Sequence, residues 1–538
     1  MASALRWVAG VLVPTLAAAL PFTARADTDD PAPGGRPPSA EEVGTLPPVQ
    51  GPAWARHREL LMGSAAFQAL QRPAPSAPVR RPNIVLITTD DQTLREMRWM
   101  PKTRALIGES GVTFDGSIAP HPLCCPARAM TLTGQYAHNN GVHSNGGAYG
   151  GYEALDHSNT LPVWLAAAGY QTAFMGKYLN GYGVPYPREV PAGWQHWYGS
   201  VRGVYDYEHT VLNQNGRLVG YPGVYQTDLY ATLTERLVPR LADAGAPFFL
   251  WQSHVAPHTE CPRALQQREY CWAPPSPGPG YRLVFDDVRP PQLDLASYDE
   301  QNVRDKSEMI RTSPRFDDET RADITELFQR RIESLASVDD AVARTLAALE
   351  EAGVLDETLV VFTSDNGYLL GEHRYVGKNV GYEPALRVPL LLRGPGVPAG
   401  VHRSQTVGTL DLAPTFLAVA EATAGPTLDG RDLMPVARRD AAGWDTMLVQ
   451  GAPRVARRED AWRYRGVRTR RWTYLEYPRS DEVELYDRRR DPLQLRSVAG
   501  APAYAATERE LAGRLAALGD CAGASCRVDF GPVPTPER

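Results

Sequence analysis

The chain has 538 residues, with 56 lysines and arginines against 62 aspartates and glutamates and a formal net charge of −6. This length exceeds what one hydrophobic core usually serves, so we expect one large domain with a smaller appendage. The charges are spread along the sequence as on an ordinary solvated surface, and the lack of a basic tract argues against a nucleic-acid partner.

The N-terminus has the layout of a secretory signal peptide. Arg6 precedes an apolar run over residues 7–22, and the small residues Ala24 and Ala26 follow. This pattern predicts cleavage after Ala26, which removes residues 1–26. The apolar run is short for a membrane span, and no later segment is apolar for long enough to cross a bilayer. We therefore expect a secreted or periplasmic protein without a membrane anchor after cleavage.

A linker and then a series of buried strands are predicted next. Residues 27–80 are rich in proline, glycine and alanine, which indicates a poorly ordered linker with one short helix near residues 54–70. Four apolar runs then predict strands that are buried on both faces, as in a parallel sheet. These runs are residues 84–87, 248–251, 359–363 and 388–392.

Helices alternate with these strands, and the pattern changes near the C-terminus. Residues 324–352 carry apolar side chains at helical spacing up to Gly353, a typical C-terminal cap. Strand and helix alternation predicts an α/β sandwich with a mostly parallel sheet, which we assign to a catalytic domain at 81–445. Short antiparallel strands at 463–468 and 472–477 and a helix at 506–518 predict a small C-terminal α+β subdomain, residues 446–538.

The six cysteines agree with export. Two short local pairs, Cys261 with Cys271 and Cys521 with Cys526, would form disulfides in an oxidising compartment, and the alternative is four reduced thiols. Cys124 and Cys125 are neighbours in the sequence, and neighbouring cysteines rarely bridge each other. Both therefore need another explanation.

Oxygen-bearing side chains follow two of the predicted strands. Asp90 and Asp91 come after the first strand, and Asp365 and Asn366 come after the strand at 359–363. Ligands in an open parallel sheet bind beyond the carboxyl ends of the strands, so these side chains predict a Ca²⁺ or Mg²⁺ site. The alternative for either pair alone is a turn or a helix cap.

The densest motif lies between these two pairs. Cys124-Cys125-Pro126-Ala127-Arg128 is followed by Leu132-Thr133-Gly134. This resembles the signature of formylglycine-dependent sulfatases, members of the alkaline phosphatase superfamily, in which a maturation enzyme converts the first cysteine to the catalytic aldehyde. The alternative is a buried thiol at the start of a helix. The resemblance extends over residues 81–495, through motifs at 83–92, 133–141, 176–180, 256–258, 364–389, 484–487 and 491–492.

The local sequence is most similar to the N-acetylglucosamine-6-sulfatase branch of that family. The double cysteine, the run at 136–140 and the run at 176–180 carry this similarity. Many arylsulfatases have a histidine two residues after the lysine that corresponds to Lys177, where this chain has Leu179. The sequence therefore leaves open which group takes the proton when sulfate is released.

The resemblance implies a role for each matching residue. Arg128 would support the aldehyde hydrate, Lys177 and Lys378 would contact sulfate, and His258 would protonate the leaving alcohol. His373 is a weaker candidate for a substrate contact. The cation, Ca²⁺ or Mg²⁺, would be held by Asp90, Asp91, Asp365, Asn366 and the modified Cys124.

The predicted function is therefore that of a secreted, calcium-dependent sulfatase acting on sulfate monoesters of an amino sugar or an aryl group. The first alternative is a phosphate or phosphonate monoester hydrolase of the same superfamily, because sulfuryl and phosphoryl groups share a shape. The second is a binding protein in which Cys124 stays a thiol. A third hypothesis gives the C-terminal subdomain a polysaccharide site at Arg471 and Trp472, although strand pairing explains the same residues.

Overall fold

The computed structural model describes residues 65–261 and 273–536. The predicted signal peptide, the first part of the predicted linker and Cys271 lie outside these residues. Within the described part of the chain, no helix is long and apolar enough to cross a membrane. Of the stretch 54–70, where one short helix is expected, the described part forms α4 (Ala65–Leu70).

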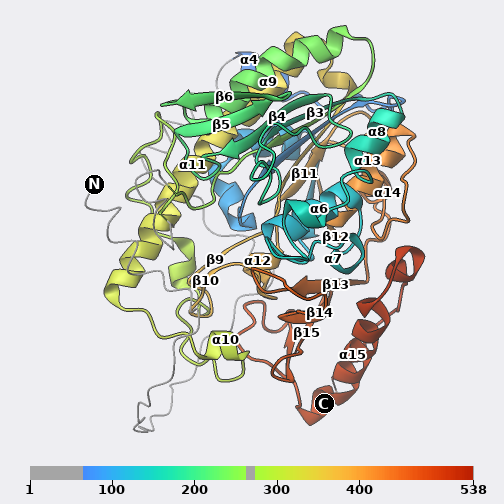
Figure 1. The fold of residues 1–538 in the computed structure, drawn as a ribbon. Coiled ribbons are helices and arrows are strands. Elements are labelled where there is room, and N and C mark those ends of the chain that lie inside the picture. Colours follow the sequence, from blue (N-terminus) through green and yellow to red (C-terminus); the bar gives the residue numbers. More distant parts are fainter. Residues whose placement is uncertain (1–64, 262–272, 537–538) are drawn as a thin grey trace.

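A ten-stranded sheet forms the centre of the molecule and confirms the predicted α/β fold (Figure 1). Its central strands β8, β1, β7, β3 and β4 run parallel to one another. In spatial order the strands are β12 (Val401–Gly408), β2 (Val112–Ile118), β11 (Leu390–Arg393), β8 (Thr358–Ser364), β1 (Asn83–Thr89), β7 (Phe248–Ser253), β3 (Gln171–Gly176), β4 (His196–Arg202), β5 (His209–Gln214) and β6 (Arg217–Pro222).

The strand expected at 388–392 differs from the other three predicted strands in direction. It forms as β11, but it pairs antiparallel with both β8 and β2. A parallel return needs a crossover segment that packs over the sheet. The connection from β8 to β11 contains only the short pair β9 (Leu369–Leu370) and β10 (Val376–Gly377) and the four-residue α12 (Glu383–Leu386), so the chain re-enters the sheet from the same end.

The sheet is buried on both faces because alternate side chains of its strands enter two separate cores. On β1, Ile84 and Leu86 pack into one core, whereas Val85 and Ile87 pack into the other. Helices on each side complete these cores (Figure 1). The first core includes residues of α6 (Cys124–Thr133), α8 (Leu161–Ala167), α13 (Leu412–Ala420) and α14 (Met434–Arg439), and the second includes residues of α9 (Gln226–Asp243) and α11 (Asp318–Glu351).

The long helix α11 confirms the helix predicted at 324–352, but it begins six residues earlier. The side chain of Asp317 caps its first turn by accepting a 2.8 Å hydrogen bond from the backbone N–H of Thr320. The first turns are polar, so hydrophobic periodicity could not reveal them. After the helix, Gly353 has φ of 71°, the left-handed conformation that the predicted cap requires.

The C-terminal region forms the predicted antiparallel sheet with a final helix. The strands are β13 (Thr446–Gly451), β14 (Tyr464–Thr469), β15 (Trp472–Tyr477) and β16 (Glu482–Asp487), and α15 (Ala505–Gly519) packs on them. Trp472 is buried and Arg471 pairs with Asp487, so strand pairing and packing account for both residues proposed to bind polysaccharide. The division of the chain at residue 445 stays a prediction.

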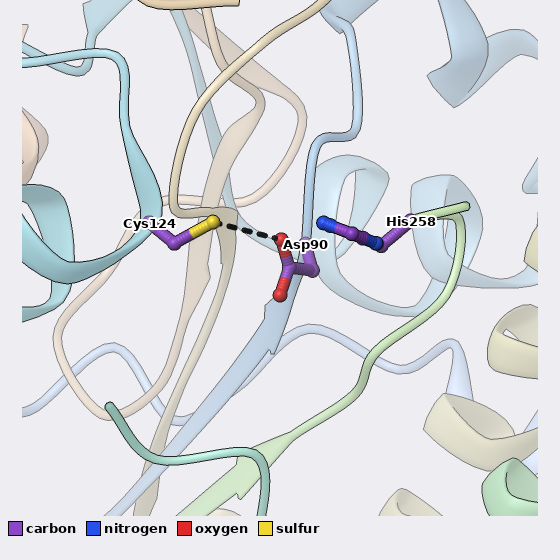
Figure 2. Close-up of side chains that lie close together, drawn as sticks. All are labelled: Asp90, Cys124 and His258. Carbon is purple, nitrogen blue, oxygen red and sulfur yellow. Dashed lines mark hydrogen bonds between the residues drawn. The ribbon is translucent and has the colours of Figure 1, made fainter. Parts of the chain in front are cut away.

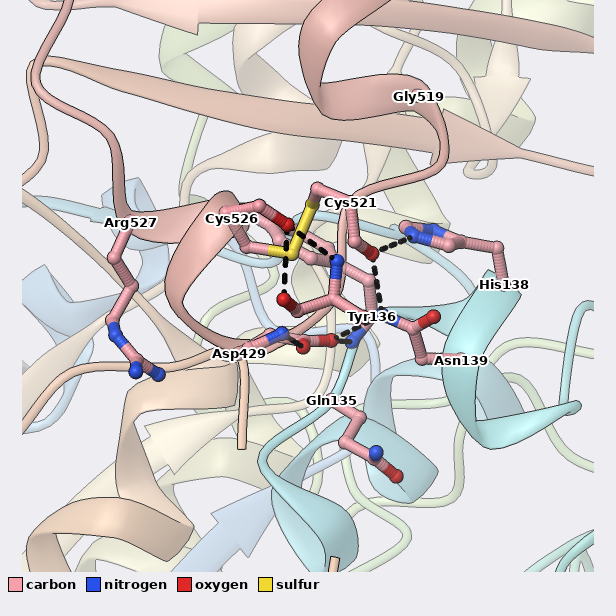
Figure 3. Close-up of a disulfide and its surroundings, with 12 residues drawn as sticks. Gln135, Tyr136, His138, Asn139, Asp429, Gly519, Cys521, Cys526 and Arg527 are labelled. Atoms are coloured by element: carbon pink, nitrogen blue, oxygen red, sulfur yellow. Dashed lines mark hydrogen bonds between the residues drawn. A yellow bond between two sulfur atoms is a disulfide. The ribbon is translucent and has the colours of Figure 1, made fainter. Parts of the chain in front are cut away.

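The predicted disulfide between Cys521 and Cys526 is present (Figure 3). The carbonyl of Cys521 accepts a 2.8 Å hydrogen bond from Asn139 and lies 2.9 Å from a ring nitrogen of His138. Both residues belong to α7 (Ala137–Asn140), the short helix after α6. These contacts hold the disulfide loop against α7, next to the helix of the cysteine motif. Two further short α-helices among the described residues are α5 (Pro101–Thr103) and α10 (Glu308–Arg311).

A core substitution on α11 tests this arrangement. Leu335 is fully buried in the second core. Leu335→Ala should lower the free energy of unfolding by about 2–5 kcal/mol, because it leaves a cavity between helix and sheet. The matched control Leu283→Ala removes a side chain that is 61% exposed and should change this free energy by less than about 0.5 kcal/mol. Urea-induced unfolding measures both, and equal losses would contradict the position of α11.

Candidate active site

The site is built where β1 and β8 end side by side. The two strands are parallel and in register, with Thr89 opposite Ser364. The residues that follow therefore meet: the backbone N–H of Asp365 donates to Thr89 O at 3.2 Å, and that of Asp91 donates to Asp365 Oδ1 at 3.1 Å. The two pairs of polar residues predicted from the strand ends are thus brought together.

Four side chains offer oxygen atoms in one buried cluster. Carboxylate oxygens of Asp90, Asp91 and Asp365 lie within 4.8 Å of one another. Asn366 donates from Nδ2 to Asp91 Oδ1 at 2.7 Å and to Gly367 O at 2.9 Å, which fixes its amide plane. Its Oδ1 is buried and has no hydrogen-bond partner among the described residues. Hard oxygen donors at this spacing, including one with an unused lone pair, fit a divalent cation of the Ca²⁺ type.

Three side-chain cations face the three carboxylates. Arg128 bridges two of them, with Nε 2.8 Å from Asp365 Oδ2 and Nη2 3.1 Å from Asp90 Oδ2. Lys177 Nζ bonds Asp90, and Lys378 Nζ bonds Asp91. All of these groups are buried or nearly so. The cluster is therefore neutral in formal charge.

The pKa values of Asp90 and Asp365 shift in opposite directions. Burial alone would raise the pKa of Asp90, but the positive charge of Lys177, with those of its other basic neighbours, brings it below the ordinary value. Burial and the negative charge of Asp90 raise the pKa of Asp365 to about 6. The charged form of Asp90 is thus better stabilised than that of Asp365.

Cys124 is the first residue of α6, and its thiol points at the carboxylate of Asp90 (Figure 2). Its Sγ lies 3.6 Å from Asp90 Oδ1 and 2.8 Å from Lys378 Nζ. Burial and the neighbouring Asp90 raise the pKa of this thiol, so it is protonated at neutral pH and a poor nucleophile in its unmodified form. Arg128 lies four residues later on the same helix face, and this spacing brings both side chains to the same cluster.

Cys125 has a different environment. Its Sγ lies 3.3 Å from Asn180 Oδ1 and accepts from the backbone N–H of Asn180 at 3.1 Å. Burial raises the pKa of its thiol to about 12. This cysteine packs into the first core, under the helix.

His258 approaches the cluster from the loop after β7 (Figure 2). Its Nδ1 lies 2.7 Å from the carbonyl of Thr259, which can only accept, so Nδ1 carries the proton of the neutral ring. Its Nε2 is the atom that faces the site, 3.7 Å from Asp91 Oδ2. Burial lowers the pKa of His258 to about 4, so the ring is neutral at neutral pH in this structure.

Two further residues join the site that the sequence did not single out. Ser253, the last residue of β7, accepts from Arg128 Nη1 at 2.7 Å and donates to Lys177 O at 2.7 Å. The ring of Tyr205 stacks on His258 with centroids 4.5 Å apart, and Lys177 Nζ lies 4.9 Å from its centre. The strand-end rule that found the carboxylates would have found Ser253, whereas no local pattern marks Tyr205.

His373, the weaker candidate for a substrate contact, is fully enclosed. Its Nδ1 lies 2.6 Å from Glu300 Oε2, and its ring packs on Tyr382 with centroids 4.5 Å apart. These contacts link the loop after β9 to residues that also contact the C-terminal sheet, because Tyr382 donates to Glu484 of β16. Its role toward substrate stays a prediction.

Comparison with known families decides what this arrangement is. The profile of the sulfatase family matches residues 82–422, which include every residue of the cluster. The chain belongs to the sulfatase family, and it is a hydrolase of sulfuric esters. A second profile, for the C-terminal part of N-sulphoglucosamine sulphohydrolase, matches residues 371–520.

Curated relatives of this sulfatase align over most of its length. The arylsulfatase of Volvox carteri is 32% identical over 517 residues, which cover 87% of this chain and 78% of that protein. The N-acetylglucosamine-6-sulfatase of Homo sapiens is 33% identical over 508 residues, which cover 84% of this chain and 87% of that protein.

Solved structures confirm the fold of this sulfatase. One, determined in complex with its substrate D-glucosamine-2-N,6-O-disulfate, superposes with a TM-score of 0.66 at 24% identity, over 81% of this chain and 97% of the other. The phosphonate monoester hydrolase of Silicibacter pomeroyi superposes with a TM-score of 0.58 at 22% identity, over 81% of this chain and 94% of the other. The same fold thus serves two classes of ester.

A buried histidine at the edge of the site gives the sulfatase a pH-dependent stability. His254 follows β7, and neither ring nitrogen has a hydrogen-bond partner among the described residues. Burial lowers its pKa from 6.5 to about 3. At pH values between about 3 and 6.5, His254 binds a proton in the unfolded chain but not in the folded one. The free energy of unfolding therefore decreases as the pH falls below 6.5.

His254→Gln should flatten this acid dependence. The variant should lose about 2 kcal/mol less unfolding free energy than the wild type when the pH falls from neutral to about 5. Urea unfolding at a series of pH values measures the slope, which is independent of any constant cost of the substitution. A variant slope equal to that of the wild type would show that His254 is hydrated in the folded protein.

Proposed function

We propose that this sulfatase hydrolyses sulfate monoesters of a sulfated amino sugar, and aryl sulfates, with Cys124 as a formylglycine and a divalent cation in the carboxylate cluster. The observation that carries the proposal is the meeting of Cys124 with four oxygen-bearing side chains and three cationic ones in a single buried cluster. The substrate class is supported by the human N-acetylglucosamine-6-sulfatase, with which this chain aligns over 84% of its length.

Asp90, Asp91, Asp365 and Asn366 would hold the cation, for which we propose Ca²⁺. Three carboxylates and an amide oxygen suit this ion, and Oδ1 of Asn366 supplies a lone pair that no described residue uses. When bound, the cation would act as a Lewis acid that lowers the pKa of a nearby hydroxyl and attracts a sulfate oxygen. It would also change the formal charge of the cluster from zero to +2, which favours an anionic substrate.

The aldehyde would form from Cys124 through a formylglycine-generating maturation enzyme. When hydrated, it would supply one hydroxyl as the nucleophile and a second whose deprotonation releases sulfate. Arg128 lies four residues along α6 and is locked by Asp90, Asp365 and Ser253, so it provides a fixed positive charge next to this position. A fixed charge stabilises a developing anion without reorganisation during the reaction.

Lys177 and Lys378 would bind the sulfate group, and His258 would protonate the leaving alcohol. Neighbouring carboxylates outweigh the effect of burial and raise the pKa of both lysines, so both stay charged at neutral pH. His258 presents Nε2 to the site while Thr259 holds the opposite nitrogen, so a proton taken up at Nε2 can only be returned on the site side. The oxygen of the departing alcohol would accept this proton from Nε2.

Export is part of the proposal. The disulfide between Cys521 and Cys526 suits an oxidising compartment, as does the signal-peptide pattern of residues 1–26. We therefore propose a secreted or periplasmic enzyme that is matured before or during folding, since Cys124 is only 1% exposed in the folded chain.

Removing the unused amide oxygen should weaken cation binding. Asn366→Leu should reduce the affinity for Ca²⁺ by at least about 10-fold, the loss that even outer partners of metal ligands cause. Calorimetric titration of Ca²⁺ into EDTA-treated protein measures it. The control Asn213→Leu replaces an equally buried asparagine whose amide donates to Tyr182 and Glu189 instead. Equal Ca²⁺ affinity in both variants would exclude Asn366 as a ligand.

Substitution of the two cysteines should affect activity very differently. Cys124→Ala should lower kcat on an aryl sulfate by at least about 10⁴-fold, as loss of a catalytic nucleophile does, whereas Cys125→Ala should keep most of it. Mass spectrometry of the tryptic peptide ending at Arg128 should find the aldehyde at Cys124 in protein from a host with the maturation enzyme. Finding only the thiol there, in active protein, would overturn the mechanism.

A phosphonate or phosphate monoester hydrolase is the second candidate, favoured by the structural similarity to the phosphonate monoester hydrolase of Silicibacter pomeroyi. Hydrolysis rates on matched aryl sulfate, phosphate and phosphonate esters distinguish the two. The proposal expects the largest kcat/KM on the sulfate ester, and a strong preference for a phosphorus ester would replace it with the second candidate.

A further inference from the structure

We propose that Arg331, in the middle of α11, is a positioning residue that holds the loops of Asp91 and His258 at their working separation. This inference rests on the proposed function of those two residues. Arg331 was not marked by any motif, because in the sequence it is one polar residue in an amphipathic helix. In the structure its side chain is fully buried under the site.

The guanidinium of Arg331 is held by a bidentate ion pair. Its Nε lies 2.7 Å from Glu96 Oε1, and its Nη2 lies 2.8 Å from Glu96 Oε2. Glu96 is itself 1% exposed and accepts from the backbone N–H of Thr93 at 2.8 Å. This fork fixes the plane of the guanidinium, so its remaining donors have defined directions.

Those remaining donors reach two site loops. Nη2 donates to the carbonyl of Asp91 at 2.6 Å, and Nη1 donates to the carbonyl of Pro257, the residue before His258, at 3.3 Å. The guanidinium also lies 4.9 Å from the ring centre of Tyr368, two residues after Asn366. One side chain therefore contacts the loops that follow β1, β7 and β8, each of which carries a proposed functional residue.

Stability alone does not explain a buried ion pair at this point. Burying an arginine and a glutamate removes the hydration of both charges, and well-packed apolar side chains often stabilise a core equally well. An apolar side chain, however, could not bond the carbonyls of Asp91 and Pro257 at the same time. What the arginine adds is geometry: the Asp91 carboxylate and His258 Nε2, whose nearest atoms are 3.7 Å apart, are tied to the same rigid group.

Lysine cannot replace this arginine, and that gives a sharp test. Arg331→Lys keeps the charge but has a single ammonium without the planar fork, so it cannot make the same set of contacts. We expect about 10-fold or more weaker Ca²⁺ binding and a kcat on aryl sulfate that is about 10- to 100-fold lower, with little change in KM. Glu96→Gln keeps the shape of the side chain but removes the counter-charge. It should lower Ca²⁺ affinity and kcat as well, but by a smaller factor.

The matched control is Arg393→Lys. Arg393 is also buried and donates to backbone carbonyls, those of Leu70, Leu106 and Arg72, at the opposite end of the sheet. It should lower the thermal midpoint of unfolding while leaving kcat and Ca²⁺ affinity near the wild-type values. All rates are divided by the formylglycine content of each preparation, so that a maturation defect does not count as a catalytic one.

The outcomes separate the inference from the function on which it rests. If the Arg331 and Arg393 variants differ only in thermal midpoint, and not in Ca²⁺ affinity or kcat, Arg331 is merely structural and the inference fails. If the wild type itself does not hydrolyse the sulfate ester, the proposed function fails, and Ca²⁺ titration of the same variants still decides the positional role. If Arg331→Lys does not fold, Glu96→Gln decides it by the same two readouts.

Discussion

The in-register pairing of β1 with β8 is the constraint on which the rest of the site depends. It forces the buried side chains of Asp90, Asp91 and Asp365 together. At an effective dielectric constant of about 20, two like charges about 4 Å apart repel by about 4 kcal/mol, so three carboxylates cannot persist there alone. Neighbouring elements therefore have to contribute positive charge, and this requirement restricts which side chains surround the strand ends.

The cations that meet this requirement come from three different parts of the chain. Arg128 belongs to α6, Lys177 follows β3, and Lys378 follows β10. Because each ion pair is buried, each one fixes the position of its own element against the sheet. The same contacts that neutralise the carboxylates thus place the start of α6, and with it Cys124, beside Asp90. The same buried ion pairs thus hold the elements in place and assemble the site.

Local chemistry in the sequence predicted the parts of this site that lie at strand ends or within a motif. Buried strands have continuous apolar runs, so the positions of Asp90 and Asp365 followed directly, and the disulfide at Cys521 followed from spacing. Two features of the fold were not predicted in this way. The direction of β11 depends on the length of the connection before it, and the start of α11 depends on a polar cap. Arg331 and Tyr205 act through contacts between distant segments, which leave no periodic signal in the sequence.

The adjacent cysteines show how the fold assigns different chemistry to identical side chains. Successive residues on a helix point about 100° apart, so Cys124 and Cys125 cannot both face the carboxylates. Cys124 lies against Asp90 and Lys378, whereas Cys125 bonds Asn180 in the core. Burial raises the pKa of both thiols, so neither is a ready nucleophile. A fold that places a cysteine among carboxylates gains little from the thiol itself, which is consistent with its use as a precursor of another group.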